Sequence, residues 1–472
     1  MRIYRRDVLR LCGVAGVGAL AGCPDGSQAG DTSQHKQTPT SSATPETPTA
    51  TLNPVESPTQ TGVNATQQAS FAPDDGDSGD RFGFPVTVSS DGSTALVGAR
   101  NDEDPNGQFA GSVYVFGNSG GSWTQQAKLA ANDGDSHDNF GISIALSNDG
   151  TTALIGASND DDPNGGGPNG MSGAGSAYVF SRLDQSWSQQ AKLAPADGDS
   201  DDDFGLAVAL SSDGTTALIG DRGDDDPNGE DSGSAYVFER EGASWNQQAK
   251  LTPEDGDSDD WFGLPIALSN DGTTALIGAY FDEDPNGEEA GSAYVFNNAG
   301  GSWSQQAKLV AADGDSNDWF GLQIALSGDG TTALIGASND EDPNGEHAGS
   351  AYIFHSGGGS WDQQEKLTPE DGNSDDHFGL AVSLSSDGTT ALVGAPSDED
   401  PNGQEGGAAY IYDSANGSWS QETKFAAAEG DNDDNFGLSV TISEDDTTVL
   451  VGAPRDEVPN GENAGSAYVF IL

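Results

Sequence analysis

A Phe-Gly pair recurs along this chain at a nearly fixed spacing and constrains the fold more than any other feature. The steps between successive pairs are 58, 64, 58, 58, 58 and 58 residues. The phenylalanines are Phe82, Phe140, Phe204, Phe262, Phe320, Phe378 and Phe436. A period of this length is typical of arrays, solenoids and propellers, in which each repeat is one supersecondary unit. The sequence therefore predicts seven copies of one unit over residues 65–472.

Each repeat is predicted to form four strands, as the third repeat illustrates. Residues 204–210 alternate between larger and smaller apolar side chains, which indicates a strand of period two. A Ser-Ser-Asp-Gly hairpin signal leads to a continuous apolar strand over 215–220, and a Pro-Asn-Gly turn follows at 227–229. Two more strands are expected at 233–238 and 244–251. Four antiparallel strands per repeat form the blade of a β-propeller.

The two ends of the repeat region predict a closed ring. The seventh repeat stops at Leu472 after its third strand, whereas residues 67–73 echo the fourth-strand segment at 189–195. A ring needs such a permutation, and a linear solenoid does not. The predicted fold is all-β: a seven-bladed β-propeller of four-stranded antiparallel blades, with the last blade closed by the N-terminal strand.

These motifs resemble the FG-GAP repeat, the blade of the integrin α-subunit propeller and of many bacterial and archaeal surface proteins. The resemblance covers residues 65–472 and includes Val-Gly-Ala-Pro at 393–396 and 451–454. Five repeats replace the final proline, for example with Arg100. The integrin-type calcium loop between the first and second strands is absent, because a short Asp-Gly turn stands there. The resemblance therefore implies a propeller and, by analogy, a binding role, but no integrin-type calcium site.

The first 64 residues are predicted to contain an export signal followed by a tether. Residues 1–23 are expected to be a twin-arginine-type lipoprotein signal, with paired arginines at 5–6 and Cys23 as the lipidation site. Its apolar run is shorter than the roughly 20 residues that a membrane-spanning helix needs. Residues 24–64 are rich in Thr, Ser and Pro and are predicted to be a disordered tether. The expected location is the extracellular face of the cytoplasmic membrane, with the lipid anchor as the only membrane contact.

The charge balance excludes one class of partner. The chain has 77 Asp and Glu against 17 Lys and Arg, a formal net charge of −60. Such a surface repels nucleic-acid phosphates and anionic lipid. It suits a halophilic protein, because the screening length falls to roughly 3 Å in molar salt. The 2 cysteines both lie within residues 1–23, so the repeats contain no disulfide or cysteine metal site.

Two sets of acidic loops are expected on one face of the ring, because strand direction alternates within each blade. One set carries Asp-x-Asp-x-Asn-Gly, which copies the opening of a calcium loop, so Ca²⁺ is the candidate cofactor. The alternative is a Pro-Asn-Gly turn in which Asp side chains bind their own backbone, and no glutamate stands at the twelfth position. The candidate metal ligands are Asp255, Asp257, Asp260, Asp282, Asp284, Asn286, Asp313, Asp315, Asp318, Asp340, Asp342 and Asn344. Six lysines near the ends of fourth strands are predicted to neutralise these loops locally.

A unique ligand site is expected where the repeats differ from one another. Trp261 and Trp319 precede the Phe-Gly pair in the fourth and fifth repeats, and Tyr280 and Phe281 replace Ser-Asn in the fourth. All four aromatic residues are expected on the acidic face, as an exposed patch for a sugar or a protein. The alternative is that the tryptophans fold over the blade tops as packing.

Catalysis has little support in this sequence. No nucleophile elbow, His-Glu-x-x-His or phosphate-binding loop occurs, and the carboxylates repeat around the ring as a scaffold's would. The predicted function is that of a lipid-anchored surface module that binds a surface protein or polysaccharide, with or without a divalent cation. The alternative is a structural surface protein without a discrete ligand, and a carbohydrate-active enzyme ranks third.

Overall fold

The computed structural model describes residues 65–472 except 104, 162–172, 200–201, 226–227, 284, 342, 400–404, 416 and 458–459. The predicted signal, Cys23 and the tether lie outside the described residues, as do two candidate metal ligands, Asp284 and Asp342. Within the described part, no helix is long and apolar enough to cross a membrane.

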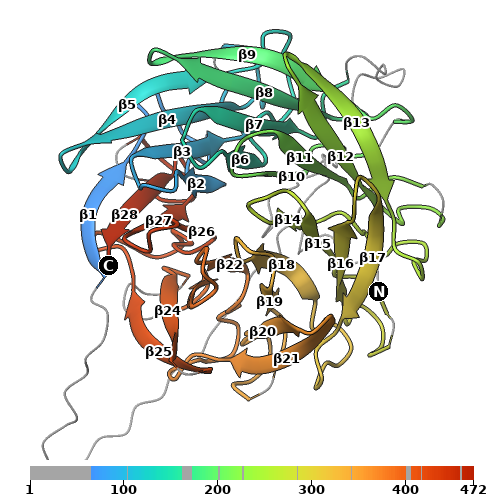
Figure 1. Ribbon diagram of the computed structural model, residues 1–472. Helices are drawn as coiled ribbons and strands as arrows, with labels where there is room; N and C mark the ends of the chain where they lie inside the picture. Colours follow the sequence, from blue (N-terminus) through green and yellow to red (C-terminus); the bar gives the residue numbers. More distant parts are fainter. Residues whose placement is uncertain are drawn as a thin grey trace, which may run out of the picture. The chain divides into compact units, whose positions relative to one another are not determined.

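The described chain forms seven four-stranded antiparallel sheets arranged as blades around an axis, as predicted (Figure 1). The first three blades consist of β2 (Val86–Val88), β3 (Thr94–Ala99), β4 (Ser112–Ser119) and β5 (Ser122–Leu129); β6 (Ile144–Leu146), β7 (Thr152–Ala157), β8 (Ser176–Leu183) and β9 (Ser186–Leu193); and β10 (Ala207–Leu210), β11 (Thr216–Asp221), β12 (Ser234–Glu241) and β13 (Ser244–Leu251). The next three consist of β14 (Ile266–Leu268), β15 (Thr274–Ala279), β16 (Ser292–Asn298) and β17 (Trp303–Leu309); β18 (Phe320–Leu326), β19 (Thr332–Ala337), β20 (Ser350–Gly357) and β21 (Ser360–Leu367); and β22 (Ala381–Leu384), β23 (Thr390–Ala395), β24 (Ala408–Ala415) and β25 (Ser418–Phe425).

The seventh blade joins the two ends of the domain. It consists of β26 (Ser439–Ile442), β27 (Thr448–Ala453), β28 (Ser466–Ile471) and β1 (Thr66–Phe71), and β1 pairs with β28. In Figure 1 the blue β1 lies beside the red β28. The ring also closes between blades, because the backbone N–H of Phe82 donates to the carbonyl oxygen of Ala464 at 2.9 Å. The predicted closure by the N-terminal strand is confirmed.

Burial along the strands follows their place in the blade. The second strand of each blade is a continuous apolar run and is almost wholly buried, because neighbouring blades cover both of its faces. The fourth strand lies at the rim and alternates between exposed and half-buried residues. Hydrophobic clusters fill the space between adjacent blades; one, for example, joins Val237 of β12 to Ile277 of β15. Burial of these facing surfaces is the main stabilising term.

In the third blade the Phe-Gly pair forms a corner, and the predicted strand start was wrong there, whereas in the fifth blade β18 does begin at the phenylalanine, Phe320. A strand was expected to begin at Phe204, but β10 begins at Ala207. Asp203 and Gly205 have φ of 69° and 89°, which extended backbone does not allow. A Cβ on Gly205 would lie 2.3 Å from the carbonyl oxygen of Ser176 in the preceding blade. The corner therefore lets one blade approach its neighbour while Phe204, fully buried, packs edge-on against Tyr236.

The short turns between first and second strands are linked around the axis. Backbone N–H groups donate to the carbonyl oxygen of the corresponding turn one blade further on, from Ser90 to Asn148 at 3.2 Å and from Ser212 to Asn270 at 3.0 Å. The side-chain amide of Asn270 also reaches Glu444 Oε1 at 2.7 Å, two blades beyond its neighbour. These bonds hold the inner ends of the blades together on this side of the ring.

Candidate functional site

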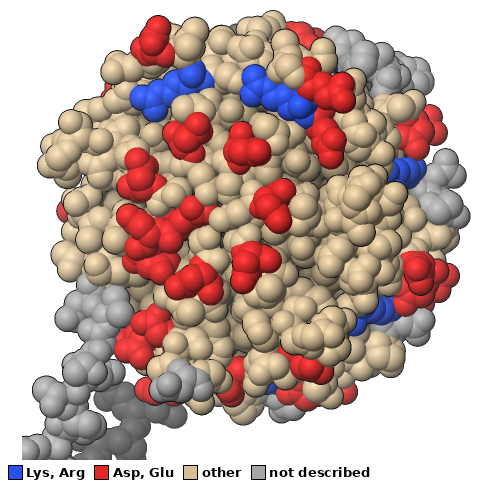
Figure 2. All heavy atoms as spheres, in the orientation of Figure 1, with Lys and Arg blue, Asp and Glu red and all other residues tan. Residues whose placement is uncertain are grey.

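The two sets of acidic loops lie together, as predicted from strand direction. In the third blade the backbone N–H of Gly223, after β11, donates to the carbonyl oxygen of Asp202, before β10, at 2.8 Å. The Asn228 side chain donates to the carbonyl oxygen of Pro253 at 3.1 Å and so reaches the loop of the next blade. We call the surface formed by these loops the acidic loop face. Acidic side chains are not confined to these loops: on the one face that Figure 2 shows, they lie near the middle and at the rim, and the basic side chains lie towards the rim.

On this face, each of the first six blades holds a lysine ammonium between two aspartates. In the third blade, Lys250 Nζ lies 3.0 Å from Asp197 Oδ2 and 2.7 Å from Asp224 Oδ2. The ammonium also lies 5.4 Å from the ring centroid of Tyr236, whose hydroxyl donates to Asp224 at 2.6 Å. The other lysines with two aspartates each are Lys128, Lys192, Lys308, Lys366 and Lys424. The predicted local neutralisation by these lysines is confirmed.

These contacts fix the protonation states in the cluster. Burial by itself would raise the pKa of Asp197, but the hydrogen bond and charge of Lys250 lower it below the ordinary value. Burial opposes the charge of Lys250, yet its two aspartates raise the lysine pKa. Burial first, and then the bond to Asp224, raises the pKa of Tyr236 far above its ordinary value, so the hydroxyl stays a donor. Each cluster is thus an internally satisfied group of charges.

The candidate metal ligands of the fourth and fifth blades belong to these clusters. Asp255 and Asp282 lie 2.9 and 2.8 Å from Lys308 Nζ. Asp313 and Asp340 both lie 2.8 Å from Lys366 Nζ. An ammonium therefore occupies the position between the carboxylates that a metal ion would take. Calcium binding there stays a prediction, and it would require displacement of the lysine.

The remaining described metal candidates hold the loops in place. The side-chain amides of Asn286 and Asn344 donate to backbone carbonyl oxygens of the next loop at 2.9 and 3.3 Å. Asp260 Oδ2 accepts the backbone N–H of Asp257 at 2.7 Å. The pair Asp318 and Asp315 repeats this bond at 2.7 Å.

One buried aspartate per blade has an unusual titration. Asp260 is 1 % exposed, and its Oδ1 has no hydrogen-bond partner. Burial first, and then the nearby charges of Asp282 and Glu283, raises its pKa to about 7 against the opposing bond from the Asp257 backbone. The equivalent aspartates, also with pKa raised to about 6 or 7, are Asp80, Asp138, Asp202, Asp318, Asp376 and Asp434.

The four candidate aromatic residues are placed more deeply than expected. Tyr280, Phe281 and Trp319 are 2 %, 5 % and 7 % exposed, and only Trp261 is half-buried. Trp261 packs against Phe281 with ring centroids 4.4 Å apart, under the guanidinium of Arg222.

Trp319 is held separately, through a hydrogen bond from Nε1 to Glu289 Oε2 at 3.3 Å. Burial of three of the four rings removes the exposed surface that the stacking hypothesis requires for them and favours the packing alternative. Ligand binding at Trp261 stays a prediction.

The seventh blade departs from the other six. Ser70 of β1 lies opposite Tyr468 of β28, the register position at which Lys250 lies opposite Tyr236. A cavity of about 300 Å³ opens there, lined in part by Ser70, Phe71, Glu429, Asp456 and Tyr468, and we call it the seventh-blade pocket.

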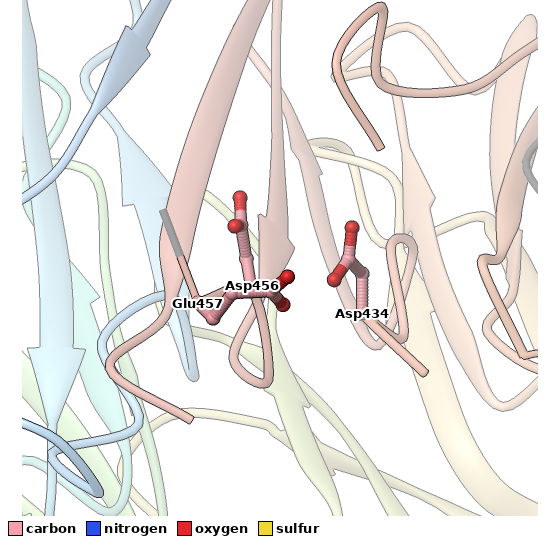
Figure 3. Close-up of side chains that lie close together, drawn as sticks. All are labelled: Asp434, Asp456 and Glu457. Carbon is pink, nitrogen blue, oxygen red and sulfur yellow. The ribbon is translucent and has the colours of Figure 1, made fainter. Parts of the chain in front are cut away.

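Beside it, carboxylate oxygens of Asp434, Asp456 and Glu457 lie within 4.8 Å of one another (Figure 3). This site was not predicted from the sequence. The signal was the serine at position 70, where the echoed fourth strand has a lysine in the other repeats.

Comparison with known protein families identifies the repeat. The family model of the FG-GAP repeat matches seven segments, residues 65–116, 123–180, 187–238, 245–296, 303–354, 361–412 and 419–470. Each segment begins on the rim strand of one blade and continues through the first three strands of the next blade. No curated protein matches the chain.

Proposed function

Since the chain belongs to the FG-GAP repeat family, we propose that it is a non-catalytic binding module that engages a surface protein or polysaccharide through its acidic loop face. In this proposal the propeller is exported, carries lipid on Cys23 and stands off the outer face of the cytoplasmic membrane on the tether of residues 24–64. Family and fold support a binding or structural module in general. The ligand and the location are the proposed part.

The observation that carries the proposal is the preformed state of the acidic loop face. In each of six blades, one lysine joins two loops that follow different strands into a cluster. Asparagine side chains then tie each blade to the next, as Asn228 does to Pro253. A surface fixed before a ligand arrives loses little conformational entropy on binding, which favours affinity.

The same geometry supports a non-catalytic role. A general acid or base must be free to exchange a proton with a substrate. In the first six blades the carboxylates of Asp224 and its equivalents are engaged by lysine and tyrosine. The repetition is that of a scaffold, and it supports the binding role over hydrolysis.

The test is capture of ligand by the purified protein in molar salt. The protein is immobilised and exposed to a glycan array and to an extract of surface proteins, with calcium and with a chelator. We expect saturable capture that is weakened when Trp261 is replaced by alanine, with Trp245→Ala on the rim strand β13 as the matched control. Capture in none of these conditions would favour the alternative, a structural surface protein without a discrete ligand.

The anchor is tested separately. The Cys23→Ser variant is expected to leave the membrane fraction and appear in the medium, because the lipid is its only proposed membrane contact. Retention of this variant in membranes would contradict the lipoprotein assignment while leaving the binding role open to its own test.

A further inference from the structure

We propose that the seventh-blade pocket binds a primary alkylammonium group. Within the proposed function, on which this part rests, the group is a lysine side chain of a protein partner. The affinity of the pocket for an ammonium ion follows from the geometry of the propeller alone and does not depend on that function.

The first six blades each show how such a site holds an ammonium group. In each, an ammonium nitrogen lies 2.7 to 3.0 Å from two carboxylates. It also lies 5.1 to 5.4 Å from the centroid of a tyrosine ring. Charge-assisted bonds and the ring face both favour a cation at this point. The only covalent link between this cation and the blade is the four-carbon stem of lysine.

The seventh blade keeps the tyrosine and the two carboxylates that surround the ammonium in the other blades, but it lacks the lysine. The Tyr468 hydroxyl donates to Asp456 at 2.5 Å, as Tyr236 does to Asp224 at 2.6 Å. Glu429 stands at the sequence position of the outer aspartate, one residue before the loop glycine, and lines the pocket. Ser70 is too short to place a group between these two carboxylates. What remains is the cavity of about 300 Å³.

A buried carboxylate adds to the negative charge beside the pocket. Asp434 is 2 % exposed, its Oδ1 has no hydrogen-bond partner, and Figure 3 shows its carboxylate facing those of Asp456 and Glu457. Burial and these neighbouring charges raise the pKa of Asp434 to about 6, against the opposing bond from the Asp431 backbone. In the other six blades the carboxylate equivalent to Asp456 pairs with a lysine, whereas the seventh blade has Ser70 at that lysine's position.

The shape of the pocket favours an alkylammonium over a hydrated metal ion. Its lining residues include Phe71 and Tyr468. Aromatic residues suit an aliphatic stem and a cation over a ring face. Calcium instead prefers six to eight oxygen ligands. The three carboxylates, whose oxygens lie within 4.8 Å of one another, make a metal ion the competing occupant, and the test separates the two.

The first experiment measures binding of n-butylammonium, the lysine side chain without its backbone. Melting temperature and calorimetric heat are followed at constant ionic strength, with tetramethylammonium, 1-butanol and calcium in parallel. We expect butylammonium alone to raise the melting temperature, by about 1–2 °C at roughly ten times its dissociation constant. Equal effects of butylammonium and tetramethylammonium would overturn the proposal, because the latter has no N–H to donate.

The control is a variant that carries its own ligand. Ser70→Lys is expected to place an ammonium in the pocket, raise the melting temperature and abolish butylammonium binding. Lys250→Ser is expected to create a second pocket in the third blade, so its lowered melting temperature is partly restored by butylammonium. Glu429→Gln, at an exposed position, is expected to weaken binding about tenfold or more.

Three outcomes would overturn the inference. Butylammonium binding that survives Ser70→Lys would place the site elsewhere. Failure of butylammonium to rescue Lys250→Ser would show that the shared receptor geometry does not bind a free ammonium. Stabilisation by calcium alone, lost in Asp434→Asn, would assign the site to a metal ion.

The source of the ammonium is tested with a lysine-bearing peptide against its acetyl-lysine form and against a free diamine. Tight binding of the diamine alone would assign the pocket to a small amine and refute the lysine-docking role. Butylammonium binding without any captured partner would refute the proposed function and leave the pocket standing. If the Ser70→Lys variant captures a partner as well as the wild-type protein does, the proposed binding function stands and the lysine-docking role of the pocket is refuted.

Discussion

Replacement of Asp260 by asparagine should make the stability of the propeller less dependent on pH. Asp260 is 1 % exposed, and burial raises its pKa from 3.8 to about 7. The folded state therefore binds this proton more tightly than the unfolded chain does. For such a group, stability falls as the pH rises from the unfolded value to the folded value, and it is constant above the latter. Asparagine cannot titrate and removes this dependence.

The size of the effect follows from the shift. Each pKa unit corresponds to about 1.4 kcal/mol. Between about pH 5 and pH 8 the unfolded carboxyl is ionised throughout, while the folded one ionises only near pH 7. The free energy of unfolding of the wild-type protein should therefore fall by about 2–3 kcal/mol over that interval because of this one side chain. The asparagine keeps an oxygen for the backbone N–H of Asp257, now 2.7 Å from Asp260 Oδ2, so the loop should be preserved.

The assay is guanidinium unfolding of both proteins at the two pH values. The gain in stability from Asp260→Asn should be about 2–3 kcal/mol larger at pH 8 than at pH 5. Asp271→Asn is the comparison: burial raises the Asp271 pKa, but bonds from Thr273 and Ser269 lower it overall. Its loss of stability should be the same at both pH values, which lie above 3.8. An equal effect of Asp260→Asn at pH 5 and pH 8 would refute the reasoning.

Further predictions concern the scaffold. Deletion of residues up to 71 removes β1 and should yield aggregated protein, seen by size-exclusion chromatography, because β28 becomes an open edge; a monomer with native circular dichroism would contradict this. Lys250→Met should lower the free energy of unfolding by about 2–3 kcal/mol, since it leaves two carboxylates unneutralised; an unchanged value would show that solvent screens the pair. Gly233→Ala should be destabilising by more than about 3 kcal/mol, because φ is +83° and the added Cβ would lie 1.9 Å from the Phe262 carbonyl oxygen. Gly242→Ala, with φ +66° and open space, should lower stability by only about 1 kcal/mol, and similar losses in both would contradict the steric argument.

Strand pattern and ring closure were readable from the sequence. The rim strand 244–251 was predicted with the bounds that β13 has. The alternation of exposed and half-buried residues is a local property of a strand with one face exposed to solvent. The last repeat lacks a fourth strand, and residues 67–73 resemble the fourth strands of the other repeats. Together these features predicted the pairing of β1 with β28. Both signals are periodicities, and a chain with this period has few ways to bury its apolar faces.

The start of the first strand was not readable in the same way. Phe204 and the residues after it alternate as a strand does, but Asp203 and Gly205 have positive φ, and Gly205 lies so close to the preceding blade that a Cβ would not fit. That contact lies between segments almost thirty residues apart, Ser176 and Gly205, so no local pattern encodes it. The same holds for Tyr280 and Phe281, whose burial depends on packing with Trp261 from another loop.

The sequence by itself determined the repeated unit, the number of blades and the closure of the ring, because each depends on periodic burial along the chain. Only the tertiary structure decided which charges meet. Lys250 reaches an aspartate 53 residues earlier, and Ser70 shares a pocket with Glu429 and Asp456 from the opposite end of the domain. The change from lysine to serine is one letter in the sequence. Its consequence, a receptor without its ammonium, exists only because ring closure brings these distant loops to the end of β1.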